Sequence, residues 1–169
     1  GNPVVVLPLD NGDNGKFIIQ ITGDVIILIF VHDGKCVEVK GTNFADGSTL
    51  QQNKCSNSPN QQFTFRPIDQ GYKGNVIPGP SEWVQIINKA NKKCIKYLQP
   101  EGQLVQDDCS DEDNCLFRVT VTIDGNYEIT NRYGSWQLVS VPKNSGANGD
   151  DVTASSKGSG NSVWIITNC

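Results

Sequence analysis

The sequence predicts an all-β protein built from three related units, and its local pattern gives the first reasons. Valine, isoleucine and threonine gather in short runs whose β-branched side chains suit a pleated sheet, and no window of helical length has apolar residues at i, i+3 and i+4. Pairs of asparagine or aspartate with glycine separate the runs and tolerate the positive φ of tight hairpin turns. The runs include 17–21, 84–87 and 119–123, and the pairs are Asn11-Gly12, Asn14-Gly15, Asp33-Gly34, Asp46-Gly47, Asp124-Gly125 and Asn148-Gly149.

Two segments of the chain repeat one another. Residues 35–63 and 93–117 each contain a lysine-cysteine pair, a leucine five residues before a second cysteine, and a closing phenylalanine. The matching residues are Cys36, Leu50, Cys55 and Phe63 in the first copy and Cys94, Leu104, Cys109 and Phe117 in the second.

A third copy has lost its cysteines but keeps the frame. Leu138 matches Ile95, Val152 matches Leu104, and Trp164 takes the place of the closing phenylalanine. Each unit has too few strands to enclose a core alone, so we expect three to pack about a pseudo-threefold axis. The expected single domain is 1–169, with repeats at approximately 1–66, 67–120 and 121–169.

Composition and charge limit the possible partners. The 169 residues carry a net charge of -4 and no basic stripe, which argues against nucleic acid. The most apolar stretch, 25–31, is far shorter than the ~20 residues of a membrane span. Six cysteines and no methionine, even at the first position, predict a mature secreted chain from which a signal peptide has been removed.

At these residues the chain resembles the ricin-B, or R-type lectin, β-trefoil family. The family's marker is a Gln-x-Trp element near the end of each repeat, whose ring enters the shared core. The resemblance extends from about Asp24 to Asn168 and implies an all-β β-trefoil with three pseudo-threefold repeats. A different all-β fold with accidental similarity is the alternative. The degenerate elements are Gln61-Gln62-Phe63, Cys115-Leu116-Phe117 and Ser162-Val163-Trp164, whose three rings are expected in equivalent buried positions.

The resemblance also implies how the cysteines pair. One bond is expected within each of the first two repeats, as in the family, and the two remaining cysteines are expected to pair with each other. Zinc binding is the competing interpretation, but the chain has no Cys-x-x-Cys pair and a single histidine. The expected bonds are Cys36–Cys55, Cys94–Cys109 and Cys115–Cys169.

No catalytic centre is expected. The single histidine, His32, precedes the turn at Asp33-Gly34, where an imidazole is usually solvated, and no nucleophile stands near it in the sequence. The acidic run 107–113 lacks the pattern of an EF-hand calcium loop and is expected to be a solvated loop. We therefore predict no enzyme activity, no metal and no cofactor.

The resembled family implies one sugar site, in the first repeat. In the family, a repeat that binds sugar has an aspartate two residues after its first cysteine and an aromatic platform two residues before its second cysteine. It also has an asparagine-glutamine pair at the Gln-x-Trp element. Carboxylates and amides bond sugar hydroxyls, and a ring covers the apolar face of the sugar. Asn53 stands where the platform would be, so any ring would come from a loop, at Phe44 or Tyr72. The alternative is that both are ordinary packed or surface aromatics. The candidate sugar-binding residues are Glu38, Gln51, Asn53, Asn60 and Gln61. The side chains of Glu38 and Asn60 are expected at the surface.

The other two repeats preserve less of the pattern. Lys96 puts a positive charge where the family has a carboxylate. An ordinary galactose pocket is therefore not expected in the second repeat, and only an acidic glycan would suit it. The corresponding residues are Lys96, Asp107 and Asn114 in the second repeat and Val139, Ser155 and Asn161 in the third.

Two functions from different classes follow. The first is a secreted carbohydrate-binding protein whose partners are glycans or glycoproteins. The alternative is a β-trefoil interaction module, such as a protease inhibitor or a toxin-like subunit, which would bind a protease or another protein through the loops 69–82 and 142–151. In that case the polar residues of the first repeat would simply order its loops.

Overall fold

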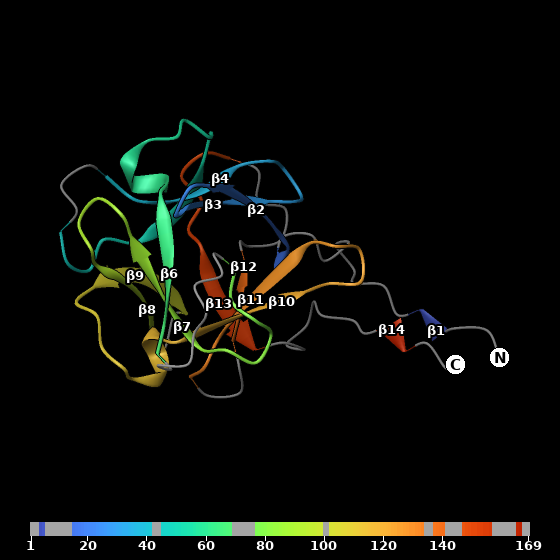
Figure 1. The fold of residues 1–169 in the computed structure, drawn as a ribbon. Helices are drawn as coiled ribbons and strands as arrows, with labels where there is room; N and C mark the ends of the chain where they lie inside the picture. Colours follow the sequence, from blue (N-terminus) through green and yellow to red (C-terminus); the bar gives the residue numbers. More distant parts are fainter. Residues whose placement is uncertain are drawn as a thin grey trace.

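The structure is a computed structural model that describes residues 4–5, 15–41, 45–68, 77–99, 102–133, 137–140, 147–156 and 165–166. Its regular elements are strands and short 3-10 turns, which confirms the predicted all-β class (Figure 1). Within these residues no helix has the length and apolar character needed to cross a membrane. The elements are β1 (Val4–Val5), β2 (Phe17–Thr22), β3 (Val25–Phe30), β4 (Cys36–Val39), β5 (Leu50–Asn53), η2 (Pro59–Gln61), β6 (Phe63–Pro67), β7 (Val84–Asn88), β8 (Cys94–Leu98), β9 (Gln103–Asp107), η3 (Asp113–Cys115), β10 (Phe117–Val121), β11 (Tyr127–Asn131), β12 (Gln137–Ser140), β13 (Thr153–Ser156) and β14 (Ile165–Ile166).

Six strands close into an antiparallel barrel: β3 pairs with β2 and β6, β7 with β6 and β10, and β11 with β10 and β2. Closure pairs each of these strands on both sides. Three further hairpins, β4–β5, β8–β9 and β12–β13, contact one another in a cycle through short bridges. A closed barrel with three linked hairpins is the β-trefoil arrangement. The strands β1 and β14 form a separate two-stranded sheet.

The three units are equivalent in register, but the third takes one strand from the beginning of the chain. Each unit consists of a barrel strand, a hairpin and a second barrel strand. In the third unit that second barrel strand is β2, which precedes the first unit in the sequence. The equivalent contacts between the two barrel strands of a unit are Ile26 with Phe63, Val84 with Phe117, and Tyr127 with Phe17.

Phe17 therefore occupies the third core position, which the sequence pattern assigned to Trp164. Phe17, Phe63 and Phe117 are all fully buried. The prediction is thus confirmed for Phe63 and Phe117 and wrong for the third position. The reason is that β2 has the same in-out alternation as the other closing strands, with Phe17 buried and Ile18 exposed. Trp164 itself lies outside the described residues.

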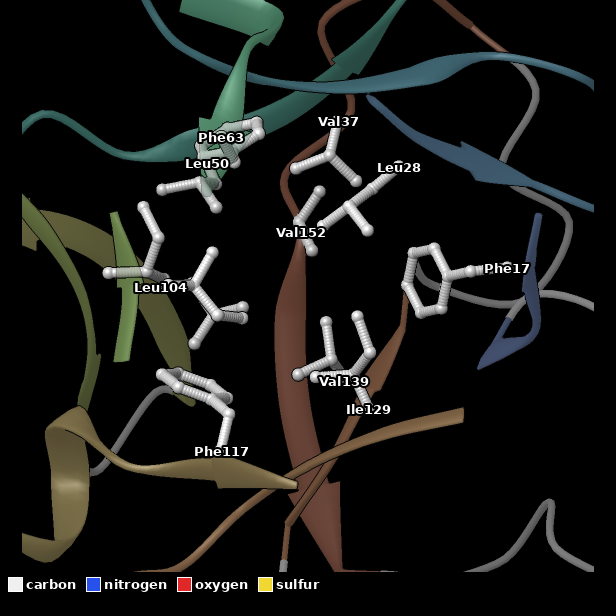
Figure 2. A pocket seen from close by; sticks show the side chains of 12 residues that line it. Phe17, Leu28, Val37, Leu50, Phe63, Leu104, Phe117, Ile129, Val139 and Val152 are labelled. Carbon is white, nitrogen blue, oxygen red and sulfur yellow. The ribbon is translucent and has the colours of Figure 1, made fainter. Parts of the chain in front are cut away.

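The units meet at an apolar centre (Figure 2). The cavity there has a volume of about 10 Å³ and is lined by apolar side chains alone. It is no larger than one water-sized sphere, and its lining offers water no hydrogen-bond partner. The space therefore belongs to the packing of the core rather than to a ligand site. Its lining consists of Leu28, Val37, Leu50 and Phe63 from the first unit, Ile86, Ile95, Leu104 and Phe117 from the second, and Ile129, Val139, Val152 and Phe17 from the third.

The third unit is offset by one residue from the sequence match. The pairing of β11 with β12 puts Leu138 where the second unit has Cys94, so Val139, and not Leu138, enters the core. Successive side chains of a strand point to opposite faces, so a shift of one residue exchanges the core face and the outer face. Ser140 consequently takes the outer position that the sequence match gave to Val139.

Two of the three expected disulfides are confirmed. Cys36 is bonded to Cys55 and Cys94 to Cys109, with Cα atoms 5.1 and 4.9 Å apart. Each bond joins the first strand of a hairpin to the segment that follows its second strand. Each is expected to stabilise the fold by roughly 2 to 4 kcal/mol.

The third expected disulfide, Cys115–Cys169, is not formed in the structure. Cys115 is a free, fully buried thiol at the end of η3, and the Ser110 hydroxyl donates a hydrogen bond of 3.3 Å to its Sγ. The thiol occupies the interior position that Gln61 holds in the first unit, so it points into the unit instead of toward a partner segment. Cys169 lies outside the described residues.

Phe17→Ala is expected to lower the free energy of unfolding by about 3 to 5 kcal/mol, as much as the same change at Phe63, because each opens a cavity in the core. Urea denaturation followed by circular dichroism measures this. Ile123→Ala is the control, since that side chain is 89% exposed and its removal should change stability by less than about 0.5 kcal/mol. A loss below about 1 kcal/mol for Phe17→Ala would mean that another side chain fills the third position.

Iodoacetamide is expected to label Cys115 in denaturant and to leave it unlabelled in the folded protein, because the thiol is fully buried. Peptide mapping under non-reducing conditions should also recover the two intra-unit disulfides. Recovery of Cys115 in a peptide linked to Cys169 would contradict the free thiol and restore the third predicted bond.

Candidate functional site

Three of the other four predicted site residues gather around the carboxylate of Glu38. Gln51, which lies opposite Glu38 across β4 and β5, donates from Nε2 to Oε1 at 2.7 Å. Asn53 donates from Nδ2 to the same oxygen at 2.8 Å, and Gln61 donates from Nε2 to Oε2 at 2.9 Å. We call Glu38, Gln51, Asn53 and Gln61 the Glu38 cluster.

Glu38 is buried, with 5% of its surface exposed, although a sugar-binding carboxylate was expected at the surface. Glu38 lies on β4, and η2, which carries Gln61, packs against this strand and donates to the carboxylate. Burial of a carboxylate is costly unless hydrogen bonds replace its lost water. Three amide donors do so here, which makes the carboxylate an organising centre for the amides around it.

Gln61 is the most deeply placed member and joins the cluster to the disulfide loop. It is fully buried. Its Nε2 also donates to the carbonyl of Lys54 at 2.9 Å, and its Oε1 accepts from the backbone N–H of Ser56 at 2.9 Å. With these contacts Gln61 holds the chain after β5 in place, so its role in the geometry is structural.

Asn53 and Asn60 form the partly exposed rim of the site. Asn60 donates from Nδ2 to the carbonyl of Val39 at 3.0 Å and accepts from the Ser58 hydroxyl at 2.6 Å. It therefore lies beside the cluster and makes no hydrogen bond to Glu38 in the described part of the chain. Each side-chain amide offers two N–H donors and two acceptor positions, so the rim has hydrogen-bonding capacity beyond these contacts. The loop aromatics considered for a platform, Phe44 and Tyr72, lie outside the described residues.

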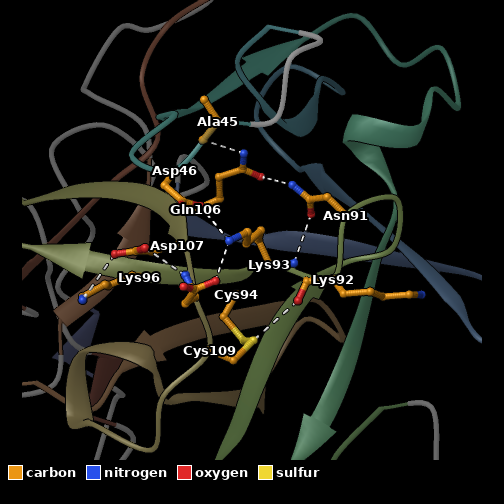
Figure 3. Close-up of polar contacts among 11 residues, drawn as sticks. Ala45, Asp46, Asn91, Lys92, Lys93, Cys94, Lys96, Gln106, Asp107 and Cys109 are labelled. Atoms are coloured by element: carbon orange, nitrogen blue, oxygen red, sulfur yellow. Dashed lines mark hydrogen bonds and ion pairs between the residues drawn. A yellow bond between two sulfur atoms is a disulfide. The ribbon is translucent and has the colours of Figure 1, made fainter.

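The second unit replaces the cluster with an ion pair (Figure 3). Lys96 takes the place of Glu38, and its Nζ lies 3.5 Å from the carboxylate of Asp107, which takes the place of Asn53. Cys115 stands where the first unit has Gln61. The amide donors are gone, and the two charges satisfy each other.

A second ionic contact in the same region joins the first two units (Figure 3). Nζ of Lys93 lies 2.9 Å from Asp46 of the first unit and also pairs with Asp108 of the second. The hydrogen bonds to Asp108 and then to Asp46 hold the pKa of Lys93 above its ordinary value. Asp107 also lies within 4.8 Å of these two carboxylates. Since Lys93 already pairs with two of the three acids, we read the group as a contact between units.

The third unit reaches the Glu38 cluster through residues 147–151. Gln51 forms an antiparallel bridge with Asp151, and the N–H of Gly149 donates to the carbonyl of Gln52 at 2.7 Å. Residues 147–151, the second half of the predicted loop 142–151, are therefore hydrogen-bonded to β5. Sequence reasoning missed this contact, although Asn148-Gly149 repeats the pair Asp46-Gly47 at the equivalent place. Among the candidate residues of the third repeat, Ser140 takes the position predicted for Val139, and Asn161 lies outside the described residues.

Two minor expectations have different outcomes. The side chain of His32 is 18% exposed, lies 3.3 Å from Asp33 and packs edge-on against Phe30, so it is not the solvated imidazole that was expected. The acidic run is solvated as predicted, since the carboxylates of Asp108 and Asp113 are well exposed.

A family model described as ricin-type beta-trefoil lectin domain-like matches residues 13–77 and 74–155. The chain therefore belongs to the ricin-type β-trefoil lectin-like family. Comparison with curated protein sequences gives no match.

Solved structures agree on the fold. A designed threefold symmetric protein, ThreeFoil, superposes with a TM-score of 0.67 at 21% identity, over 86% of this chain and 99% of its own. The Rhizoctonia solani agglutinin gives 0.60 at 12% identity, over 99% and 100%. The C-half of an earthworm R-type lectin, in complex with GalNAc, gives 0.59 at 15% identity, over 86% and 99%.

Glu38→Ala is expected to destabilise the protein by about 3 kcal/mol, because it leaves three amide donors without their acceptor. Thermal and urea unfolding measure the loss. Asp24→Ala is the matched control, since Asp24 is an exposed acid whose ion pair with Lys89 is screened by solvent, so its removal should change stability far less. Equal small effects of the two changes would contradict the organising role of Glu38.

Proposed function

We propose that the protein is a secreted carbohydrate-binding protein that engages glycans or glycoproteins at the first unit, without a chemical step and without a metal or cofactor. The observation that carries the proposal is the Glu38 cluster. Its carboxylate and the amide of Gln61 stand at positions that the resembled family uses for sugar, and Asn60 beside the cluster completes the asparagine-glutamine pair, in the one unit whose described residues keep that set. Membership of a lectin-like family supports the same conclusion.

The chemistry of the cluster suits hydroxyl groups. Three amides share one carboxylate, so their positions are fixed before a ligand arrives, and less freedom is lost on binding. Asn53 and Asn60, at the partly exposed rim, add donors and acceptors of the kind that adjacent sugar hydroxyls need.

The same geometry implies weak binding. Asn53 cannot supply the stacking surface that an aromatic ring gives to the apolar face of a sugar. Affinity for a monosaccharide should therefore be on the order of millimolar, which corresponds to about 4 kcal/mol.

Secretion belongs to the same proposal. Two disulfides are typical of a chain that folds in an oxidising compartment. They also suit a protein that meets glycans outside the cell.

A protein-binding role is the second candidate, and one described surface favours it. The end of β10 and the turn that follows it carry Val121 and Ile123, which are 66% and 89% exposed. The backbone N–H of Thr122 donates to the carbonyl of Asn126 at 2.8 Å, which closes the turn, and Lys16 pairs with Asp124 at 2.9 Å. Apolar side chains on a fixed turn are suited to insertion into a partner's pocket.

A glycan array, followed by ligand-observed NMR titration of the sugars that bind, tests the proposed function. Asn60→Ala is expected to weaken binding about tenfold while the protein stays folded, because it removes a donor and an acceptor from the rim. Asn114→Ala, the same change at the equivalent position of the second unit, is the matched control and should leave binding unchanged.

A protease-inhibition panel run beside the array separates the two candidates. Absence of binding across the array would overturn the carbohydrate proposal. Inhibition of a protease that is lost with Ile123→Asp would then support the protein-binding role.

A further inference from the structure

A row of three polar side chains crosses from the first unit to the third. Glu38 lies opposite Gln51 across β4 and β5, and Gln51 lies opposite Asp151 in an antiparallel bridge. Residues directly opposite each other in antiparallel strands place their side chains on the same face. Glu38, Gln51 and Asp151 therefore share the outer face of this part of the sheet, with the amide of Gln51 in the middle.

The bridge between Gln51 and Asp151 is of the type that brings side chains closest. Backbone hydrogen bonds of 2.8 and 2.9 Å flank the pair on its two sides, while the two residues themselves exchange none. In such a pair the Cα atoms are roughly 4.5 Å apart, against about 5.5 Å in a hydrogen-bonded pair. The carboxylate of Asp151 is thus within reach of a ligand that contacts the amide of Gln51.

The two acids of the row differ in how much of their acceptor capacity is used. Both oxygens of Glu38 already accept hydrogen bonds from protein amides. Asp151 is partly exposed, and its carboxylate has no hydrogen bond or ion pair with any residue in the described part of the chain. Asp151 therefore has the carboxylate that a ligand hydroxyl could use.

The backbone around Asp151 is fixed by its neighbours. The carboxylate of Asp150 accepts from the N–H of Ala147 at 3.0 Å and from Nε2 of Gln52 at 3.3 Å. Gly149 has a φ of 90°, and a Cβ added there would lie 3.7 Å from Oε1 of Gln51. The segment is thus hydrogen-bonded to β5 through backbone and side-chain groups, and Asp151 is held beside the cluster instead of on a loose loop.

From these contacts we infer that Asp151 is a ligand-contacting residue of the Glu38 site and that the site takes neutral sugars. The site is then composite, with the carboxylate supplied by the third unit and the fixed amides by the first. Two acids on one face repel carboxylated or sulfated sugars, while the carboxylate of Asp151 accepts a hydrogen bond from a neutral hydroxyl. The inference rests on the proposed function and adds to it a residue and a ligand class.

The test is ligand-observed NMR of the full chain with galactose, N-acetylgalactosamine, N-acetylglucosamine, mannose, glucose and sialic acid. For the neutral sugar that binds best, Asp151→Asn is expected to raise Kd about tenfold and to leave the melting temperature unchanged, since a charge-assisted hydrogen bond to the ligand is lost. Asp24→Asn removes the same charge from an exposed turn and should leave Kd unchanged.

The possible outcomes distinguish a failure of the role of Asp151 from a failure of the proposed carbohydrate-binding function. Binding by Asp151→Asn equal to that of the wild type, while Asn60→Ala binds more weakly, would overturn the role of Asp151 and leave the carbohydrate function in place. Sialic acid as the best ligand would overturn the neutral-sugar class. No binding by the wild type to any sugar of the panel would overturn both the inference and the proposed function.

Discussion

The pairing of β2 with both β3 and β11 is the contact on which the rest of the structure depends. It turns a row of barrel strands into a closed ring and brings Phe17 to the third core position. With the ring closed, the apolar centre is lined by equivalent residues of all three units, and the three hairpins are held against one another. The Glu38 site follows from this arrangement, because its two sides come from hairpins that only the closed ring brings into contact.

The same backbone supports different chemistry in each unit. At one equivalent position the first unit has the buried amide of Gln61, the second the buried thiol of Cys115, and the third Gly15. A Cβ added to Gly15 would lie 3.0 Å from the side chain of Leu138, so the third unit has no room there for a hydrogen-bonding group. Pseudo-threefold symmetry is thus kept at the apolar centre, where shape matters, and lost at this buried position, where the three units have an amide, a thiol and a glycine.

The fold was predictable because its signals are periodic and repeated. Phe63, Phe117 and the two cysteine frames lie in register, so the prediction of the fold does not depend on any one of these signals alone. Sequence alignment was weaker in the third unit, where no cysteine fixes the frame, and a slip of one residue exchanged Val139 with Ser140. The place of Phe17 could not be predicted from the order of the repeats, because strand pairing joins the third unit to the beginning of the chain.

The sequence predicted which residues form the candidate site but not how deeply Glu38 is buried. The spacing from the cysteines located Glu38 and its amides, but the burial of Glu38 depends on η2 packing over it, which no local pattern records. Asp151 was missed for a similar reason. Its neighbour Gln51 is a hundred residues earlier in the chain, and only the cycle of bridges between hairpins brings them together.

Closure of the barrel by β2 also has a consequence for the order in which the protein folds. The contacts within each hairpin join residues close in sequence, whereas Lys16 and Asp124, which meet beside β2 and the β10–β11 turn, are 108 residues apart. Closing so long a loop costs chain entropy before the packing of the core can compensate for that loss. We therefore expect the hairpins to form early and the ring to close late, which makes the seam between β2 and β11 the slow step of folding and the place where the native barrel first opens.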